Sequence, residues 1–179
     1  MSLTVEIFFH MDAASGRDWA GDPEERPLTE LGRRQADRIA EELGTQPVNA
    51  VFATPNVRCR QSVEPIAKRF GLEVQDVPRF ADELDLRAQG ANPLASAYLA
   101  GAAASDLDRI GTTLPNGRVV ICSNGGDIVP GLMAYLAGRA KQSPIPKKLD
   151  SLRGGVYEVV FEGEKAMVSQ REASPDFPV

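Results

Sequence analysis

The chain has 179 residues, which is enough for one domain with a sizeable core and short for two. Its hydrophobic fraction of 42% and charged fraction of 25% exclude the disordered and membrane classes. The net charge of -5 gives no general attraction for nucleic acid or for an anionic membrane. With no signal-peptide pattern at the start, we expect one cytoplasmic domain over 1–179.

The first predicted strand is 5–9, with the sequence VEIFF, because this run is short, β-branched and aromatic. The chain's only histidine, His10, follows at the C-terminal end of that strand. Residues 12–26 contain glycine, proline and many charges without helical periodicity, so they are predicted to form a long loop over the edge of the sheet. Loops of this length often carry function.

The next segments predict two helices that alternate with two strands. Thr29 suits a helix N-cap, and the apolar residues after it lie on one helical face until Gly44. Residues 50–53 predict a short strand, and a turn and a second helix follow it up to Phe70. Residues 72–77 alternate in polarity, which indicates a third strand.

The second half of the chain continues the alternation after an acidic cluster whose structure the sequence does not indicate. The alanine-rich residues 94–110 favour a helix, and 119–122 predict a buried strand before a glycine turn and another helix. A hairpin that turns at 162–164 predicts a sheet edge. We therefore expect an α/β three-layer sandwich, with a mostly parallel central sheet and helices on both faces.

Three turns are expected to meet at one edge of this sheet, because ligands bind outside the carboxyl ends of parallel strands. They contain His10, residues 54–58 and residues 123–126. A glycine pair such as the one in 123–126 lets backbone N–H groups approach an anion. One histidine and two separated cysteines supply no recognisable set of metal ligands. Cys59 and Cys122 are expected to be reduced core residues.

Three segments, PLTELGRRQADRIAEEL, ATPNVRCRQSVEPIA and VVICSNGGDIVP, resemble the histidine phosphatase superfamily, which is also called phosphoglycerate mutase-like. The chain is most similar to small members without a large cap, including phosphohistidine phosphatases and the phosphatase domains joined to Nudix hydrolases in actinobacteria. The resemblance implies the phosphoglycerate mutase-like fold and a phosphohydrolase site that needs no metal or other cofactor.

The resemblance also shows which catalytic residues are replaced. The family's first motif is Arg-His-Gly or Arg-His-Ala, and its histidine becomes phosphorylated; here it reads Phe9, His10, Met11. His10 is thus the implied nucleophile, and the arginine is missing. The family's later Ser-His-Gly motif holds the phosphoryl group with its histidine, which is Asn124 here.

Other family residues are retained. The arginine of the family's Ser-Pro-x-x-Arg motif is Arg58, so the implied phosphate-binding residues are Arg58, Asn124 and the backbone of Gly125. The general acid aligns near Asp82 or Glu83, and we favour Glu83. Arg17 or Arg60 is a further candidate to hold an anion, although the family pattern supports neither.

The sequence leaves three functional hypotheses. Losing one preorganised donor typically costs on the order of 10²–10³ in rate, so the first is an impaired or inactive phosphatase, a pseudoenzyme, that binds a phosphorylated small molecule or a phosphoprotein. The second is an active phosphomonoesterase that uses His10 and a substitute cation. The third is a protein-interaction module with a vestigial pocket and an unknown partner, favoured if Phe9, Met11 and Trp19 form an exposed patch.

Overall fold

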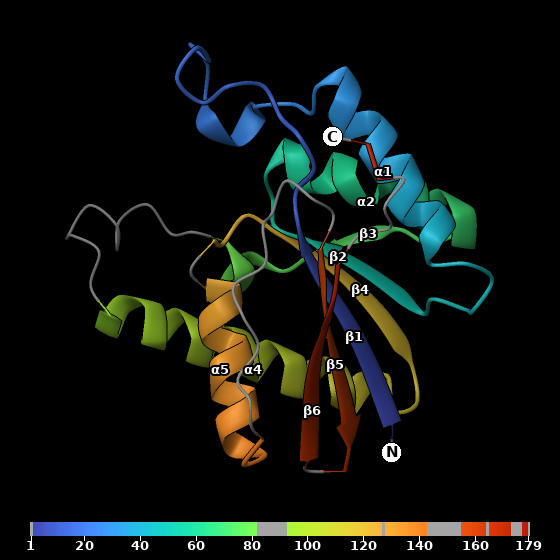
Figure 1. The fold of residues 1–179 in the computed structure, drawn as a ribbon, viewed down its shortest axis with the longest axis vertical. Helices are drawn as coiled ribbons and strands as arrows, with labels where there is room; N and C mark the ends of the chain where they lie inside the picture. Colours follow the sequence, from blue (N-terminus) through green and yellow to red (C-terminus); the bar gives the residue numbers. More distant parts are fainter. Residues whose placement is uncertain are drawn as a thin grey trace.

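The computed structural model describes residues 2–81, 93–126, 128–142, 155–163, 165–172 and 177–178. Within them, six strands form one sheet in the order β3-β2-β4-β1-β5-β6 (Figure 1). The strands are β1 (Ser2–Phe9), β2 (Ala50–Ala53), β3 (Val74–Asp76), β4 (Arg118–Ser123), β5 (Val156–Glu162) and β6 (Lys165–Arg171).

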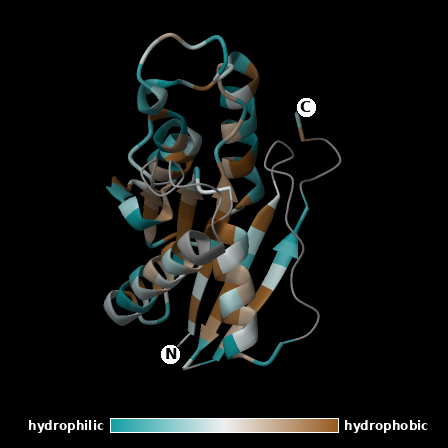
Figure 2. Cartoon of the chain, turned by 90° about the vertical axis from the view of Figure 1, so that its left-hand side faces the viewer, coloured by the Kyte–Doolittle hydropathy of each residue, from teal (hydrophilic) through white to brown (hydrophobic). Residues whose placement is uncertain are grey.

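Helices cover both faces of this sheet, which confirms the expected three layers (Figure 1). The helices are α1 (Glu30–Glu42), α2 (Val57–Phe70), α4 (Pro93–Thr113) and α5 (Ile128–Arg139), with short 3-10 turns η1 (Pro23–Glu25) and η2 (Pro78–Phe80). One apolar cluster packs α1 and α2 on the sheet, and a second packs α4 and α5 on its other face. Figure 2 shows the apolar residues concentrated on the central strands and on the helix faces that cover them.

Strand direction also follows the prediction. β3, β2, β4 and β1 run parallel to their neighbours, whereas β5 and β6 pair antiparallel and place β6 at one edge. The β5–β6 hairpin turns at Gly163, whose φ of 63° lies in the left-handed region that glycine adopts without strain. The sheet is therefore mostly parallel, with the predicted hairpin at its edge.

Two strand boundaries differ from the sequence prediction. β1 begins at Ser2 rather than residue 5, because β5 pairs with it from Ser2 onward despite the polar start of the strand. β3 covers only Val74–Asp76, because its partner β2 is four residues long and ends at Ala53. Local hydrophobicity does not indicate where β1 begins or how long β3 is, because pairing with a neighbouring strand determines both.

The helix boundaries and the thiols agree with the sequence analysis. The Thr29 side chain caps α1 by accepting a hydrogen bond from the Gly32 N–H. Cys59 and Cys122 are free and fully buried, and they lie close enough for their side chains to share a hydrogen bond. Among the described residues, no helix is both long enough and apolar enough to cross a membrane.

Candidate functional site

The turns after the parallel strands meet at one edge of the sheet, as predicted. The His10 N–H donates to the Ser123 carbonyl at 3.3 Å, which joins the turns after β1 and β4. The Thr54 N–H donates to the Cys122 carbonyl at 3.1 Å, and the Ser123 hydroxyl donates to the Phe80 carbonyl at 2.6 Å. Two backbone bonds and one side-chain bond therefore connect the four turns.

His10 is held as a neutral imidazole at this edge. Its Nδ1 lies 2.8 Å from the Met11 carbonyl oxygen, which can only accept, so Nδ1 carries the proton and Nε2 keeps its lone pair. Burial lowers the pKa of His10 to about 4, and the positive charges of Arg58 and Arg26 act in the same direction. Asp12 and the bond to Met11 oppose this shift only in part. A neutral histidine with a free Nε2 is the form that can attack phosphorus.

Arg58 lies beside His10, in the first turn of α2. Its side chain is buried, with 7% of the residue exposed, and its Nη1 donates to the Pro23 carbonyl at 2.7 Å. Its Nε is buried and has no hydrogen-bond partner among the described residues. The guanidinium thus retains donor capacity that a phosphate oxygen could use.

Arg26 is the site residue that the sequence analysis missed. It ends the long loop, and its positive charge acts on the pKa of both His10 and Arg58. Its Nη1 donates to the Ala14 carbonyl at 3.0 Å, which fixes the guanidinium against the start of the same loop. The only local signal is an arginine three residues before the Thr29 cap of α1, a common position for a surface cation.

The two cations considered from sequence lie elsewhere. Arg17 is exposed, and Arg60 forms an ion pair with Asp76 at the end of β3. Asp82 and Glu83, the candidates for the general acid, lie outside the described residues. Among the described residues, no three His, Cys, Asp or Glu side chains are grouped as a metal site would require.

In the glycine turn after β4, the backbone N–H groups of both glycines are bonded within the turn. The Gly125 N–H donates to the Ser123 hydroxyl at 2.9 Å, and the Gly126 N–H donates to the Asn124 carbonyl at 3.0 Å. A Cβ on Gly125 would lie 2.8 Å from the Phe80 carbonyl oxygen, so glycine is required here for packing. Asn124 Oδ1 is buried without a partner among the described residues. In this turn, the unused polar group is therefore the Asn124 amide oxygen rather than the Gly125 backbone.

The three apolar residues near His10 form no exposed patch. Phe9 is 5% exposed and Met11 is 1% exposed, so both belong to the core. Trp19 is half-buried, and its indole N–H donates to the Asp22 carbonyl at 2.8 Å within the loop. The condition that would have favoured an interaction module is not met.

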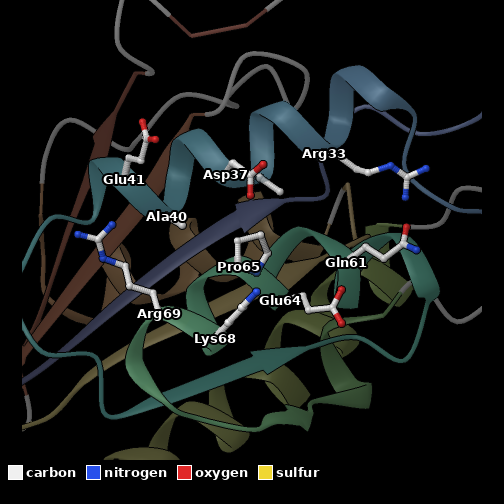
Figure 3. A pocket seen from close by; sticks show the side chains of 10 residues that line it. Arg33, Asp37, Ala40, Glu41, Gln61, Glu64, Pro65, Lys68 and Arg69 are labelled. Carbon is white, nitrogen blue, oxygen red and sulfur yellow. The ribbon is translucent and has the colours of Figure 1, made fainter.

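A separate groove of about 900 Å³ lies between α1 and α2 (Figure 3). Ala40 and Pro65 line it together with charged side chains such as Asp37 and Lys68. Neither His10 nor Arg58 lines it. The groove is therefore distinct from the edge of the sheet where the turns meet.

Comparison with known proteins points to a family. A sequence model of the histidine phosphatase superfamily (branch 1) matches residues 13–88, which include the long loop, α1, α2 and Arg58. This match covers less than half of the chain and indicates the histidine phosphatase superfamily. The matched segment begins three residues after His10 and ends before β4, so both altered motifs lie outside it.

One phosphatase is similar to most of this chain. The chain is 28% identical over 141 residues to an 8-oxo-(d)GTP phosphatase of Mycolicibacterium smegmatis. That match covers 79% of this chain and 39% of the relative, so the chain spans about two fifths of the relative's length.

Two solved structures share the fold. YhfR of Bacillus stearothermophilus has a TM-score of 0.72 at 15% identity, with 93% of this chain and 95% of YhfR covered. The protein histidine phosphatase SixA, complexed with tungstate, has a TM-score of 0.57 at 21% identity, with 94% and 96% covered.

Proposed function

We propose that this protein is a cytoplasmic member of the histidine phosphatase superfamily that binds the phosphoryl group of a small molecule or a phosphoprotein, and that its own hydrolytic activity is impaired. The observation that carries the proposal is that Ser62 joins the turn of the neutral His10 to the helical turn of the buried cation Arg58, and the charge of Arg26 also acts on His10. The guanidinium groups can donate to an oxyanion, and the imidazole lone pair is a nucleophile that can face phosphorus.

The impairment follows from the charges that are absent. A transferring phosphoryl group spreads negative charge over its oxygens, so catalysis depends on positioned cations and donors. Phe9 supplies neither, and Asn124 supplies an amide without a positive charge. Two such losses would reduce the rate by more than ~10⁴ if each costs on the order of 10²–10³. Ground-state binding would be reduced less, since Arg58 and Arg26 remain.

A second candidate is an active phosphomonoesterase, and one observation favours it. Arg26 brings a positive charge to His10 and Arg58, which is what a substitute for the missing arginine must do. The relative from M. smegmatis is named an 8-oxo-(d)GTP phosphatase, so nucleotide phosphates are reasonable first substrates to assay.

Two measurements on the purified chain separate these candidates. Calorimetric titration with inorganic phosphate compares wild type with Arg58→Met and Arg26→Met, and Arg60→Met is the matched control because Arg60 pairs with Asp76. Turnover of an aryl phosphate and of a nucleotide panel compares wild type with His10→Ala. Binding that needs both site arginines, without turnover, supports the first candidate.

Other outcomes decide differently. Turnover that disappears in His10→Ala would establish the active enzyme. In that case Arg26→Met should also lose most of the rate. The absence of both phosphate binding and turnover in wild type would overturn the proposed function.

A further inference from the structure

The two peptide groups that follow His10 are each held by a buried side chain from a different helix. The Met11 N–H donates to the Ser62 hydroxyl oxygen of α2 at 3.0 Å. The Asp12 N–H donates to the Gln35 Oε1 of α1 at 2.8 Å. Gln35 is 1% exposed and Ser62 is fully buried, so neither bond competes with bulk water.

The peptide between Met11 and Asp12 is fixed at both of its polar ends. Its carbonyl oxygen accepts from His10 Nδ1 at 2.8 Å, and its N–H donates to Gln35. This peptide can rotate only if both bonds break. Each bond also polarises the peptide group and so strengthens the other bond. Gln35 therefore acts on His10 through one peptide unit without contacting the imidazole.

Ser62 connects the histidine turn to the arginine that faces it. Its hydroxyl accepts from Met11 N–H and donates to the Arg58 carbonyl at 2.8 Å. One hydroxyl group thus sets the distance between the backbone that carries His10 and the helical turn that carries Arg58. A methyl group in its place would leave the buried Met11 N–H without an acceptor.

We infer that Gln35 and Ser62 are positioning residues, which together hold His10 in the Nδ1–H tautomer and keep its Nε2 aligned with Arg58. This inference rests on the proposed function, because the direction of the Nε2 lone pair matters only if Arg58 holds a phosphoryl group beside it. Partners of this kind, one layer behind a functional histidine, fix its tautomer and ring orientation.

The lone histidine makes the test direct. ¹⁵N chemical shifts of the imidazole report the tautomer of His10 without any assignment step, since the chain has a single histidine. We expect wild type to show the Nδ1–H tautomer alone at neutral pH. Gln35→Met and Ser62→Ala should show a mixture of tautomers, because each removes a bond that holds the Met11 backbone.

Conservative variants separate positioning from general packing. Gln35→Glu keeps an acceptor for the Asp12 N–H but loses the donor that Gln35 Nε2 offers to the Pro178 carbonyl at 2.7 Å, so the tautomer should be retained. Ser62→Thr keeps the hydroxyl and should also retain the tautomer. Ser105→Ala is the matched control, because Ser105 donates to the Gly101 carbonyl one turn earlier and contacts no loop.

The outcomes are distinct. A single Nδ1–H tautomer in folded Gln35→Met and Ser62→Ala would overturn the inference. If either variant fails to fold, a mixed tautomer in Gln35→Glu or Ser62→Thr would overturn it equally. Tautomer mixing in the variants, with no phosphate binding by wild type, would uphold the positioning role and reject the proposed function.

Discussion

The rings of Phe9 and Tyr157 pack edge to face, with centroids 6.4 Å apart and an angle of 77° between their planes. The resemblance aligns Phe9 with the family's first arginine, and Phe9 belongs to the apolar layer between the sheet and helices α4 and α5. Tyr157 comes from β5, directly beside β1. The substitution thus removes a cation and also adds a core contact.

Restoring the arginine is therefore expected to harm the fold. Phe9→Arg places a guanidinium next to Tyr157 in this apolar layer and should lower the free energy of unfolding by ~3–5 kcal/mol. Urea denaturation measures this loss. Asn124→His, at a half-buried turn, is the comparison and should cost less. Equal urea midpoints for Phe9→Arg and wild type would show that the arginine finds a polar environment.

Stability should depend on pH through His10. Its pKa is about 4 when folded and 6.5 when unfolded, so the unfolded state binds the proton more readily. Its contribution is complete above pH 6.5 and is lost as pH falls from 6.5 to 4, by on the order of 3 kcal/mol. Chemical denaturation at a series of pH values should show this slope in wild type and a smaller one in His10→Gln. Parallel slopes in the two proteins would contradict the lowered pKa.

Anion binding should change the emission of the only tryptophan. Arg58 Nη1 donates to the Pro23 carbonyl in the loop that also carries Trp19, and an oxyanion on Arg58 would compete for this donor. Titration with inorganic phosphate or tungstate should therefore shift Trp19 fluorescence in wild type. Arg58→Met should abolish the shift and Arg60→Met should keep it. Calorimetric binding with unchanged emission would show that the loop keeps its place.

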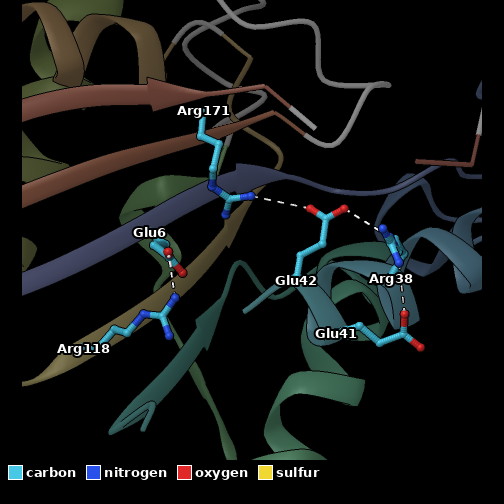
Figure 4. A network of polar contacts seen from close by, with 6 residues as sticks. All are labelled: Glu6, Arg38, Glu41, Glu42, Arg118 and Arg171. Carbon is cyan, nitrogen blue, oxygen red and sulfur yellow. Dashed lines mark hydrogen bonds and ion pairs between the residues drawn. The ribbon is translucent and has the colours of Figure 1, made fainter. Parts of the chain in front are cut away.

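A buried ion pair at the opposite end of the sheet should contribute strongly to stability (Figure 4). Arg118 Nη2 lies 2.9 Å from Glu6 Oε1, and the Glu6 side chain is 5% exposed. Arg118→Met leaves this carboxylate buried without its cation, which should cost ~3–5 kcal/mol. The exposed pair of Arg33 and Glu30 is the control, and Arg33→Met should change stability by about 0.5 kcal/mol or less. Equal losses in the two variants would contradict this burial argument.

The sequence predicted the fold well because its signals are local. The cap at Thr29, the buried run in β4 and the turn at Gly163 each depend on a few adjacent residues, and the structure has all three. The sequence also predicted that the turns at His10 and 54–58 meet, because parallel strands end at the same edge of a sheet.

The site residues that the sequence did not predict depend on distant contacts. Arg26 reaches His10 because a long loop folds back over the sheet, which no periodicity reports. Gln35 and Ser62 read as ordinary helix residues, and their partners lie 23 and 51 positions away along the chain. Phe9 could be placed in the core only once Tyr157 was known to be its neighbour across β1 and β5.

The central position of β1 in the sheet makes the backbone next to His10 rigid. β1 pairs with β4 on one side and β5 on the other, so its backbone amides should be among the slowest in the molecule to exchange with solvent. His10 is attached to this strand, whereas Pro23 and Arg26 come from a surface loop with few backbone bonds of its own. The candidate site thus combines a histidine fixed at the end of a central strand with residues from a surface loop.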